Sequence, residues 1–151
     1  MTAAIALGSN LGDRRAHLDF AVTKLTHLLH DLSISSYYET DPVGVSGAHP
    51  RFLNAAATGT ASITAREILE ALLAIERARD RQRPYVNAPR TLDLDLILFG
   101  DAVIDEPDLQ VPHPRFRDRR FVLEPLAEIA PSLRDPVTGH TIDELLRRMS
   151  C

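Results

Sequence analysis

The chain has 151 residues, 44% of them hydrophobic, and a formal net charge of −4, so we expect one globular domain spanning residues 1–151. The negative charge argues against a general binder of nucleic acid or of anionic membranes. No apolar run approaches the length of a membrane span, no secretory signal is visible, and there is a single cysteine, so we expect a cytoplasmic protein.

The first part of the chain predicts a strand, a helix and two more strands. Residues 3–7 are apolar and precede the turn-forming sequence GSN, which indicates a short buried strand. Asp13 is a suitable N-cap, and apolar residues spaced by three and four predict a helix over 14–30. β-Branched and aromatic residues predict strands over 34–40 and 52–60, with a loop rich in proline and glycine between them.

The middle of the chain predicts a second helix and the clearest strand. Thr64 and Glu67 form a capping box at the start of a helix that we expect to end near residue 79. Residues 80–89 contain two prolines and no apolar period, so they predict a loop. Strong alternation over 91–99 predicts a strand.

The C-terminal part predicts additions to this core. Residues 103–111 predict a hairpin or an extended arm, 121–129 are short and mixed, and 142–149 predict a helix capped by Thr141. The overall order of strand, helix, strand, strand, helix and strand is the ferredoxin-like pattern. We therefore predict an α+β fold with a mainly antiparallel sheet, helices packed on it and a C-terminal extension.

Two aspartates alternate with leucines in the strongest strand. Side chains alternate across a strand, so Asp93 and Asp95 share one face while the leucines fill the other. The Cα atoms of the two aspartates should be about 6.6 Å apart, at roughly 3.3 Å per residue, so the two carboxylates can converge on a hard cation such as Mg²⁺ together with water and phosphate oxygens. The alternative is a half-exposed strand whose polar face is acidic.

The arginines are concentrated in two segments, although Lys24 is the only lysine. Five fall between residues 77 and 90, and four between 115 and 120. Guanidinium groups pair bidentately with phosphate oxygens, so Arg81, Arg83 and Arg90 beside the acidic strand suit a triphosphate. Arg77 and Arg79 are instead interpreted as last-turn helix residues that favour the helix dipole. No Walker A sequence is present, so a nucleotide enzyme would depend on metal and arginine.

Four further residues suit a small-molecule site. His113 is held between two prolines and could contact a phosphate or donate a proton, or it could be a packing residue. Asn54 lies in an apolar strand, where a buried amide needs partners and could read the edge of a heterocycle. Phe52 and Phe121 could sandwich a planar ring, although ordinary core packing is the simpler reading.

Several segments together resemble the 6-hydroxymethyl-7,8-dihydropterin pyrophosphokinase family. Residues 88–100 (APRTLDLDLILFG) resemble the family's signature almost letter for letter, and residues 5–12 (IALGSNLG) resemble its N-terminal motif. FLNA at 52–55 resembles its pterin-contacting strand. VPH at 111–113, Arg119 with Phe121, and PLAEIAP at 125–131 resemble its C-terminal third. The resemblance extends from about residue 3 to residue 145.

The resemblance implies roles for individual residues. Asp93 and Asp95 match two magnesium-bridging aspartates, and with Arg81, Arg83 and Arg90 of the catalytic loop they would be the catalytic set. Pterin would be bound by Thr40, Val43, Phe52, Asn54, Asp93 and Phe121. ATP would be bound by Glu76, Arg81, Arg83, Arg90, Leu96, Gln110, His113 and Arg119, with Leu96 contacting adenine through its backbone.

The implied reaction transfers the pyrophosphate of ATP to the pterin hydroxymethyl group in folate synthesis, with two Mg²⁺ ions and release of AMP. The resemblance also implies a monomer that binds ATP and 6-hydroxymethyl-7,8-dihydropterin. The chain departs from the family's pattern at Asp80, at Pro84 and Tyr85, at Asn87 and at Asp108, which affects the loop and ATP affinity more than the chemistry.

Two other classes of function fit parts of the sequence. An RNA-binding ferredoxin-like module would use the arginines, but it needs exposed aromatic residues on the central strands, and only 5% of the residues are aromatic. A metal-dependent nuclease would use Asp93 and Asp95, but it needs further acidic residues converging there, and none is obvious.

Overall fold

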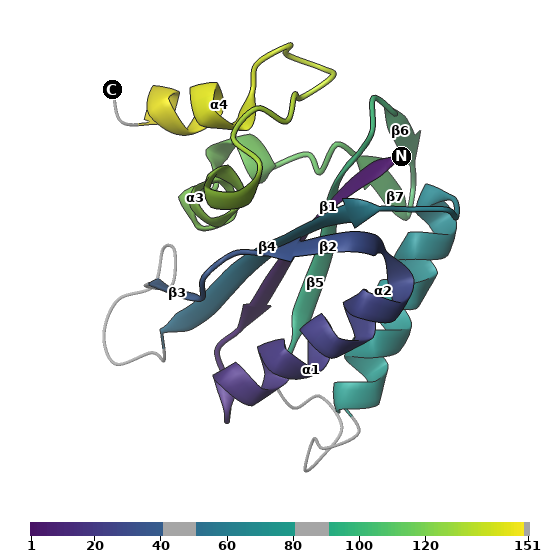
Figure 1. The fold of residues 1–151 in the computed structure, drawn as a ribbon, viewed down its shortest axis with the longest axis vertical. Helices are drawn as coiled ribbons and strands as arrows, with labels where there is room; N and C mark the ends of the chain where they lie inside the picture. Colours follow the sequence, from purple (N-terminus) through teal and green to yellow (C-terminus); the bar gives the residue numbers. More distant parts are fainter. Residues whose placement is uncertain (41–50, 81–90, 150–151) are drawn as a thin grey trace.

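The computed structural model describes residues 1–40, 51–80 and 91–149 and has an α+β architecture (Figure 1). Val43, Arg81, Arg83 and Arg90 lie outside the described residues. The elements in chain order are β1 (Thr2–Ser9), α1 (Arg14–Leu28), β2 (His30–Ile34), β3 (Tyr38–Thr40), β4 (Phe52–Thr60), α2 (Ala65–Asp80), β5 (Asp93–Phe99), β6 (Ile104–Glu106), β7 (Leu109–Val111), the 3-10 helix η1 (Phe116–Asp118), α3 (Arg120–Ile129) and α4 (Ile142–Met149).

The main sheet has the strand order β2-β4-β1-β5, and its described pairs are all antiparallel. β3 pairs with the beginning of β4, and β6 and β7 form a separate hairpin. With β2, β4 and β5 counted as the second, third and fourth core strands, this is the ferredoxin-like order. The predicted fold class is therefore confirmed.

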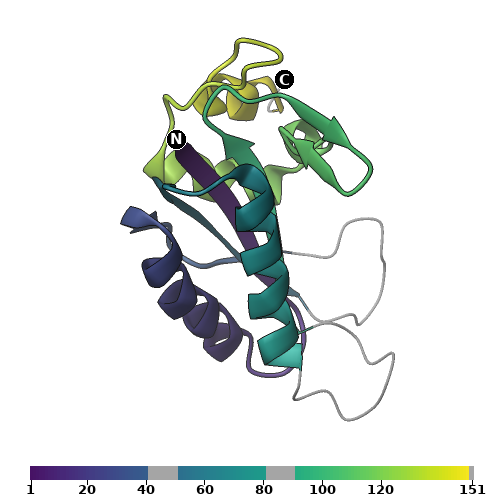
Figure 2. The same cartoon turned by 90° about the vertical axis from the view of Figure 1, so that its right-hand side faces the viewer.

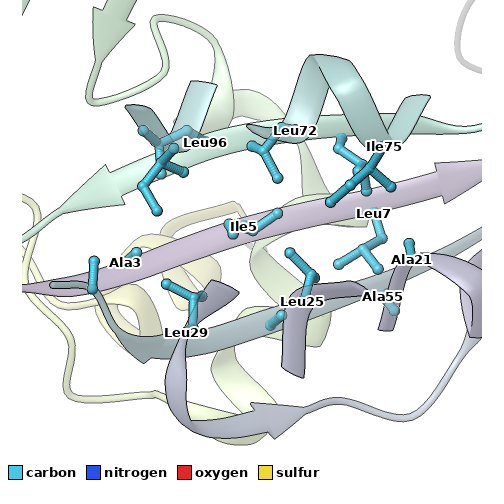
Figure 3. Packing of buried hydrophobic residues seen from close by; sticks show 14 of the residues in the cluster. Ala3, Ile5, Leu7, Ala21, Leu25, Leu29, Ala55, Leu72, Ile75 and Leu96 are labelled. Carbon is cyan, nitrogen blue, oxygen red and sulfur yellow. The ribbon is translucent and has the colours of Figure 1, made fainter. Parts of the chain in front are cut away.

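Helices cover both faces of the sheet. α1 and α2 lie side by side on one face (Figure 2), where a core of small and branched side chains fills the space between them and the strands (Figure 3). α3 and α4 pack on the other face around Phe116 and Leu123, both fully buried. No helix among the described residues is long and apolar enough to cross a bilayer. Because α3 and α4 cover only part of their face, the ends of β1, β4 and β5 are left accessible from that side.

The helix starts follow the predicted caps. The Asp13 carboxylate accepts a hydrogen bond from the Ala16 N–H at 3.1 Å. Thr64 and Glu67 form the reciprocal capping box, with the Glu67 N–H donating to the Thr64 hydroxyl and the Thr64 N–H to the Glu67 carboxylate. Thr141 caps α4 in the same way with Glu144. These contacts satisfy backbone N–H groups that have no partner within the helix.

Two segments differ from the sequence-based expectation. The helix expected over 14–30 ends at Leu28, and β2 begins at His30, so only its last residue, Ile34, falls within the strand expected over 34–40. After Ile34 the Ser35 hydroxyl accepts the Ala56 N–H, and the second short strand, β3, follows at Tyr38–Thr40. The mixed segment 121–129 is the helix α3, even though it contains Pro125. Burial of Val122, Leu123 and Leu126 against the sheet stabilises this helix.

Candidate active site

A cavity of about 700 Å³ opens at one end of the main sheet, beside the end of β1 and the starts of β4 and β5. Gly8 of β1 lies directly between Asn54 of β4 and Asp93 of β5 in the strand register. Helix α2 forms one wall, and η1 with the start of α3 forms another. Eight residues proposed from sequence line this cavity: Thr40, Phe52, Asn54, Glu76, Asp93, Asp95, Arg119 and Phe121.

Asp93 and Asp95 present their side chains to the cavity, as alternation predicts. Both are exposed, whereas Leu94 and Leu96 are buried in the core beneath α2. Within the described part of the chain, no group of three or more His, Cys, Asp or Glu side chains could hold a metal ion. A hard cation here would therefore have two carboxylates from these residues and the rest of its oxygen ligands from water and phosphate, which is how Mg²⁺ is usually bound in nucleotide sites.

Asn54 is buried, and its amide group is held by a neighbouring strand. Its Nδ2 donates to the hydroxyl of Thr40 at 2.5 Å. A Cβ added at Gly8 would lie 3.0 Å from the Asn54 Oδ1, so glycine leaves room for the amide to lie across β1. The amide therefore has a fixed orientation in the cavity, which suits recognition of a planar heterocycle.

Phe52 and Phe121 enter the cavity from β4 and α3 respectively. Both are partly exposed, unlike ordinary core phenylalanines such as Phe116. The Arg119 guanidinium carbon lies 5.6 Å from the centre of the Phe121 ring. The cavity therefore combines aromatic surface with a cation, which suits a ligand having both a ring and a negative charge.

The second arginine cluster divides between the cavity and the protein interior. Arg115, Asp118 and Arg119 line the cavity. Arg117 points the other way and pairs with Asp135. The sequence indicates a basic cluster, but the tight turn of η1 determines which members face the cavity. Arg115 is thus a site residue that was not singled out from the sequence.

His113 lies beside the cavity, although it is not part of its lining. Its backbone N–H donates to the Ile97 carbonyl at 2.9 Å, and its ring Nδ1 accepts the backbone N–H of Arg115 at 3.1 Å. Burial lowers the pKa of His113 below its usual 6.5; Asp95 opposes this shift, while Arg119 and Arg115 add to it. A neutral imidazole whose Nδ1 is an acceptor leaves its other nitrogen, Nε2, as a hydrogen-bond donor.

We expect His113 to titrate below pH 6.5 in the free protein, measured by NMR of its ring protons. Arg119→Ala removes a positive charge and should raise this pKa, whereas Asp95→Asn removes a negative charge and should lower it further. Between the pKa of His113 in the folded protein and 6.5, its pKa in the unfolded chain, the unfolded chain binds more protons than the folded protein. His113 therefore makes the free energy of unfolding fall as the pH drops through that interval. A midpoint above 6.5, or shifts of opposite sign, would contradict the geometry.

Three residues proposed from the sequence to bind ATP make contacts within the protein or lie away from the cavity. Glu76 is buried, and its carboxylate accepts the Leu94 N–H at 2.7 Å on the outer edge of β5. The Leu96 side chain is in the core, and strand alternation directs its backbone to the same outer edge. Gln110 is exposed on β7, lies outside the cavity lining and contacts Asp105.

Two other features of α2 bear on the site. Leu69 and Leu73 line the cavity as an apolar wall, and Leu73 stays 39% exposed. The sequence places both in the apolar stripe of the helix but does not show that they leave the core.

Arg79 lies in the last turn of α2, as predicted, and its Nε donates to the His17 Nδ1 at 2.7 Å. The Arg79 side chain is therefore directed at α1, and it lies outside the cavity lining.

Comparison with known proteins gives consistent matches over most of the chain. Residues 4–131 match the family model of 7,8-dihydro-6-hydroxymethylpterin-pyrophosphokinase (HPPK). A protein of Pseudomonas aeruginosa named 2-amino-4-hydroxy-6-hydroxymethyldihydropteridine pyrophosphokinase is 41% identical over 144 residues, covering 94% of this chain and 88% of its own length. The Bacillus subtilis protein of the same name is 43% identical over 148 residues, covering 94% and 86%.

A solved structure supports the fold. The crystal structure of wild-type Plasmodium falciparum HPPK-DHPS superposes with a TM-score of 0.79 over 97% of this chain, at 15% sequence identity. This chain spans 44% of that longer protein. At 15% sequence identity this match shows only that the two proteins share the arrangement of helices and strands.

Proposed function

The chain belongs to the 7,8-dihydro-6-hydroxymethylpterin-pyrophosphokinase family, and we propose that it transfers the terminal diphosphate of ATP to the hydroxymethyl group of 6-hydroxymethyl-7,8-dihydropterin. The observation that carries this proposal is the convergence in one cavity of the buried Asn54 amide, the aromatic pair Phe52 and Phe121, and the carboxylates of Asp93 and Asp95. This combination would hold a heterocycle at one end and a metal-bound polyphosphate at the other.

The pterin would lie between Phe52 and Phe121, with its polar edge on Asn54. Thr40 already fixes the Asn54 amide, so no side-chain ordering is needed when the ring binds. Val43 would contribute backbone contacts from the segment that follows Thr40. A flat, polar ring would therefore obtain both stacking and directional hydrogen bonds.

The nucleotide would lie on the other side of the cavity, between α2 and η1. Arg119 and His113 would bind phosphate oxygens, the latter as a neutral donor. The nucleoside would be bound by Glu76, Gln110 and the backbone of Leu96. Arg81, Arg83 and Arg90 are proposed as further phosphate contacts on the basis of the sequence.

Asp93 and Asp95 would hold magnesium ions, and Mg²⁺ bound there would offset the negative charge of the phosphates. In the proposed reaction the substrate hydroxyl oxygen forms a bond to the β-phosphorus of ATP. The bond from that phosphorus to the oxygen bridging the α- and β-phosphates breaks, and AMP leaves with that oxygen. The hydroxyl proton is lost, and Asp93 would lie close enough to accept it. Positioning and charge neutralisation would supply most of the catalysis.

The setting of the enzyme is also part of the proposal. We propose that it acts as a monomer in the cytoplasm, where ATP is available. Light scattering of the purified protein would test the monomer directly.

Phosphorus NMR of the product tests the reaction. With ATP, Mg²⁺ and 6-hydroxymethyl-7,8-dihydropterin, the pterin product should show two coupled phosphorus resonances, as expected for a diphosphate ester. A pterin carrying a single phosphorus would indicate ordinary phosphoryl transfer and contradict the proposal.

A further inference from the structure

A partly buried ion pair anchors the segment that carries the cavity's arginines. Arg117 lies in η1, between cavity residues Arg115 and Arg119, and its guanidinium group binds Asp135 in the connection between α3 and α4. The pair is bidentate, with Nε donating to Oδ2 at 2.6 Å and Nη2 to Oδ1 at 3.0 Å. This fork geometry fixes the direction of the arginine as well as its distance.

The acceptor side of this pair is fully enclosed. Asp135 is 0% exposed, and its carboxylate also accepts the Val137 N–H at 3.0 Å and the Thr138 hydroxyl at 2.7 Å. Burial alone would raise the pKa of the Asp135 carboxyl, but hydrogen bonds from Arg117, Thr138 and the Val137 amide outweigh it and keep the pKa below its usual range. The carboxylate therefore stays charged and in one position at neutral pH.

The arginine side is also confined. The Arg117 guanidinium carbon lies 4.8 Å from the centre of the Phe116 ring, and that ring is 0% exposed in the core beneath α3. Arg117 is thus held between an aromatic face and a carboxylate. Since η1 consists of only three residues, fixing its middle residue also limits the backbone on either side.

Arg119 lies at the junction that this anchor controls. Its N–H donates to the Phe116 carbonyl at 3.2 Å, and its own carbonyl accepts the N–H groups of Val122 and Leu123 at 3.0 Å each. It is therefore the residue at which η1 ends and α3 begins. A rotation of η1 would change the direction in which the Arg119 side chain enters the cavity.

We propose that Asp135 is a positioning residue, which acts through Arg117 to hold Arg119 toward the nucleotide side of the cavity. Asp135 lies outside residues 4–131, the part of the chain that matches the family model. The inference rests on the proposed function, because it assigns Arg119 to ATP phosphate.

A double-mutant cycle between Asp135→Asn and Arg119→Ala tests the proposal. Asp135→Asn should raise the KM for ATP roughly tenfold, because a misdirected Arg119 guanidinium loses charge-assisted hydrogen bonds to phosphate. In the Arg119→Ala background the same substitution should change neither KM nor kcat by more than about twofold, because the group it positions is gone. Its effect on the unfolding midpoint should be the same in both backgrounds.

Thr141→Ala provides a matched control for loss of stability. It removes the α4 cap in the same C-terminal region without touching Arg117, so it should lower the unfolding midpoint and leave the KM for ATP unchanged. All assays are run well below the lowest midpoint in the set. If Asp135→Asn has no effect on KM, or lowers kcat/KM by the same factor with and without Arg119, the positioning role is wrong.

Failure of the proposed function would be seen separately. If the wild-type protein forms no AMP, the same cycle can be measured on the Kd of a non-hydrolysable ATP analogue by calorimetry. Coupling in that binding cycle supports the positioning role, and additivity overturns it.

Discussion

Replacing Asp95 with alanine is expected to lower kcat/KM for AMP formation on the order of a thousandfold or more. A bound metal supplies several kcal/mol of charge stabilisation, and each 1.36 kcal/mol corresponds to a factor of ten in rate. Because Asp95 is exposed and lies on the same face as Asp93, its loss should change the free energy of unfolding by no more than about 0.5 kcal/mol. Steady-state kinetics and chemical denaturation of the same preparation measure both quantities.

Asp101→Ala is the matched control for this experiment. Asp101 is exposed just beyond the opposite end of β5 and lies outside the cavity lining, so this variant should keep wild-type rates. Titration with Mg²⁺ adds a second criterion, because Asp95→Ala should require more metal to reach its own maximum rate. If Asp95→Ala retains most of the activity, the acidic face of β5 is only a solvated strand surface.

Replacing Asn54 with alanine is expected to raise the KM for the pterin by roughly 10- to 100-fold and to leave the KM for ATP nearly unchanged. A buried polar group left without its partner costs about 1–3 kcal/mol, and 1.4 kcal/mol is a tenfold change in affinity. The substrate would lose the amide's hydrogen bonds while keeping its stacking on Phe52 and Phe121. Kinetics with each substrate varied in turn separates the two effects.

Two variants test whether the orientation of Asn54 matters as well as its presence. Thr40→Val removes the hydroxyl that accepts the Nδ2 hydrogen bond, and Gly8→Ala places a methyl group 3.0 Å from Oδ1. Both should raise the KM for the pterin by a smaller factor than Asn54→Ala. If Asn54→Ala affects both substrates equally, the amide supports the sheet and does not recognise the ring.

Much of the fold follows from patterns that are local in the sequence. Period-two alternation gives β5, and the caps at Asp13, Thr64 and Thr141 give the helix starts. Between β2 and β3 the Ser35 hydroxyl accepts the Ala56 N–H, a contact that no periodicity reveals. These contacts exist only once distant strands have come together.

Helix α3 shows the limit of pattern reading. Pro125 usually indicates a helix end, because proline lacks the N–H that the helix needs. Here burial of the apolar side of α3 against the sheet outweighs that cost, and such packing depends on the whole fold. Short helices in proteins are generally stabilised more by packing of their apolar face than by the local propensity of their residues.

The site was predictable where it depended on strand geometry and less so where it depended on turns. The shared face of Asp93 and Asp95 follows from alternation alone. Arg117 lies in the turn of η1 and Arg119 just beyond it, and they take different directions; the partner of Arg117, Asp135, lies 18 residues further along the sequence. Glu76 accepts an N–H from the edge of β5, and the sequence of α2 gives no sign of this contact.

The most direct test of the central claim is chromatographic separation of AMP from ADP after incubation with ATP and Mg²⁺, with and without 6-hydroxymethyl-7,8-dihydropterin. We predict that AMP forms in amounts equal to the pterin consumed, and that it does not form when the pterin or the metal is omitted. Formation of ADP, or of AMP at a rate independent of the pterin, would contradict the assignment of this cavity to pyrophosphoryl transfer.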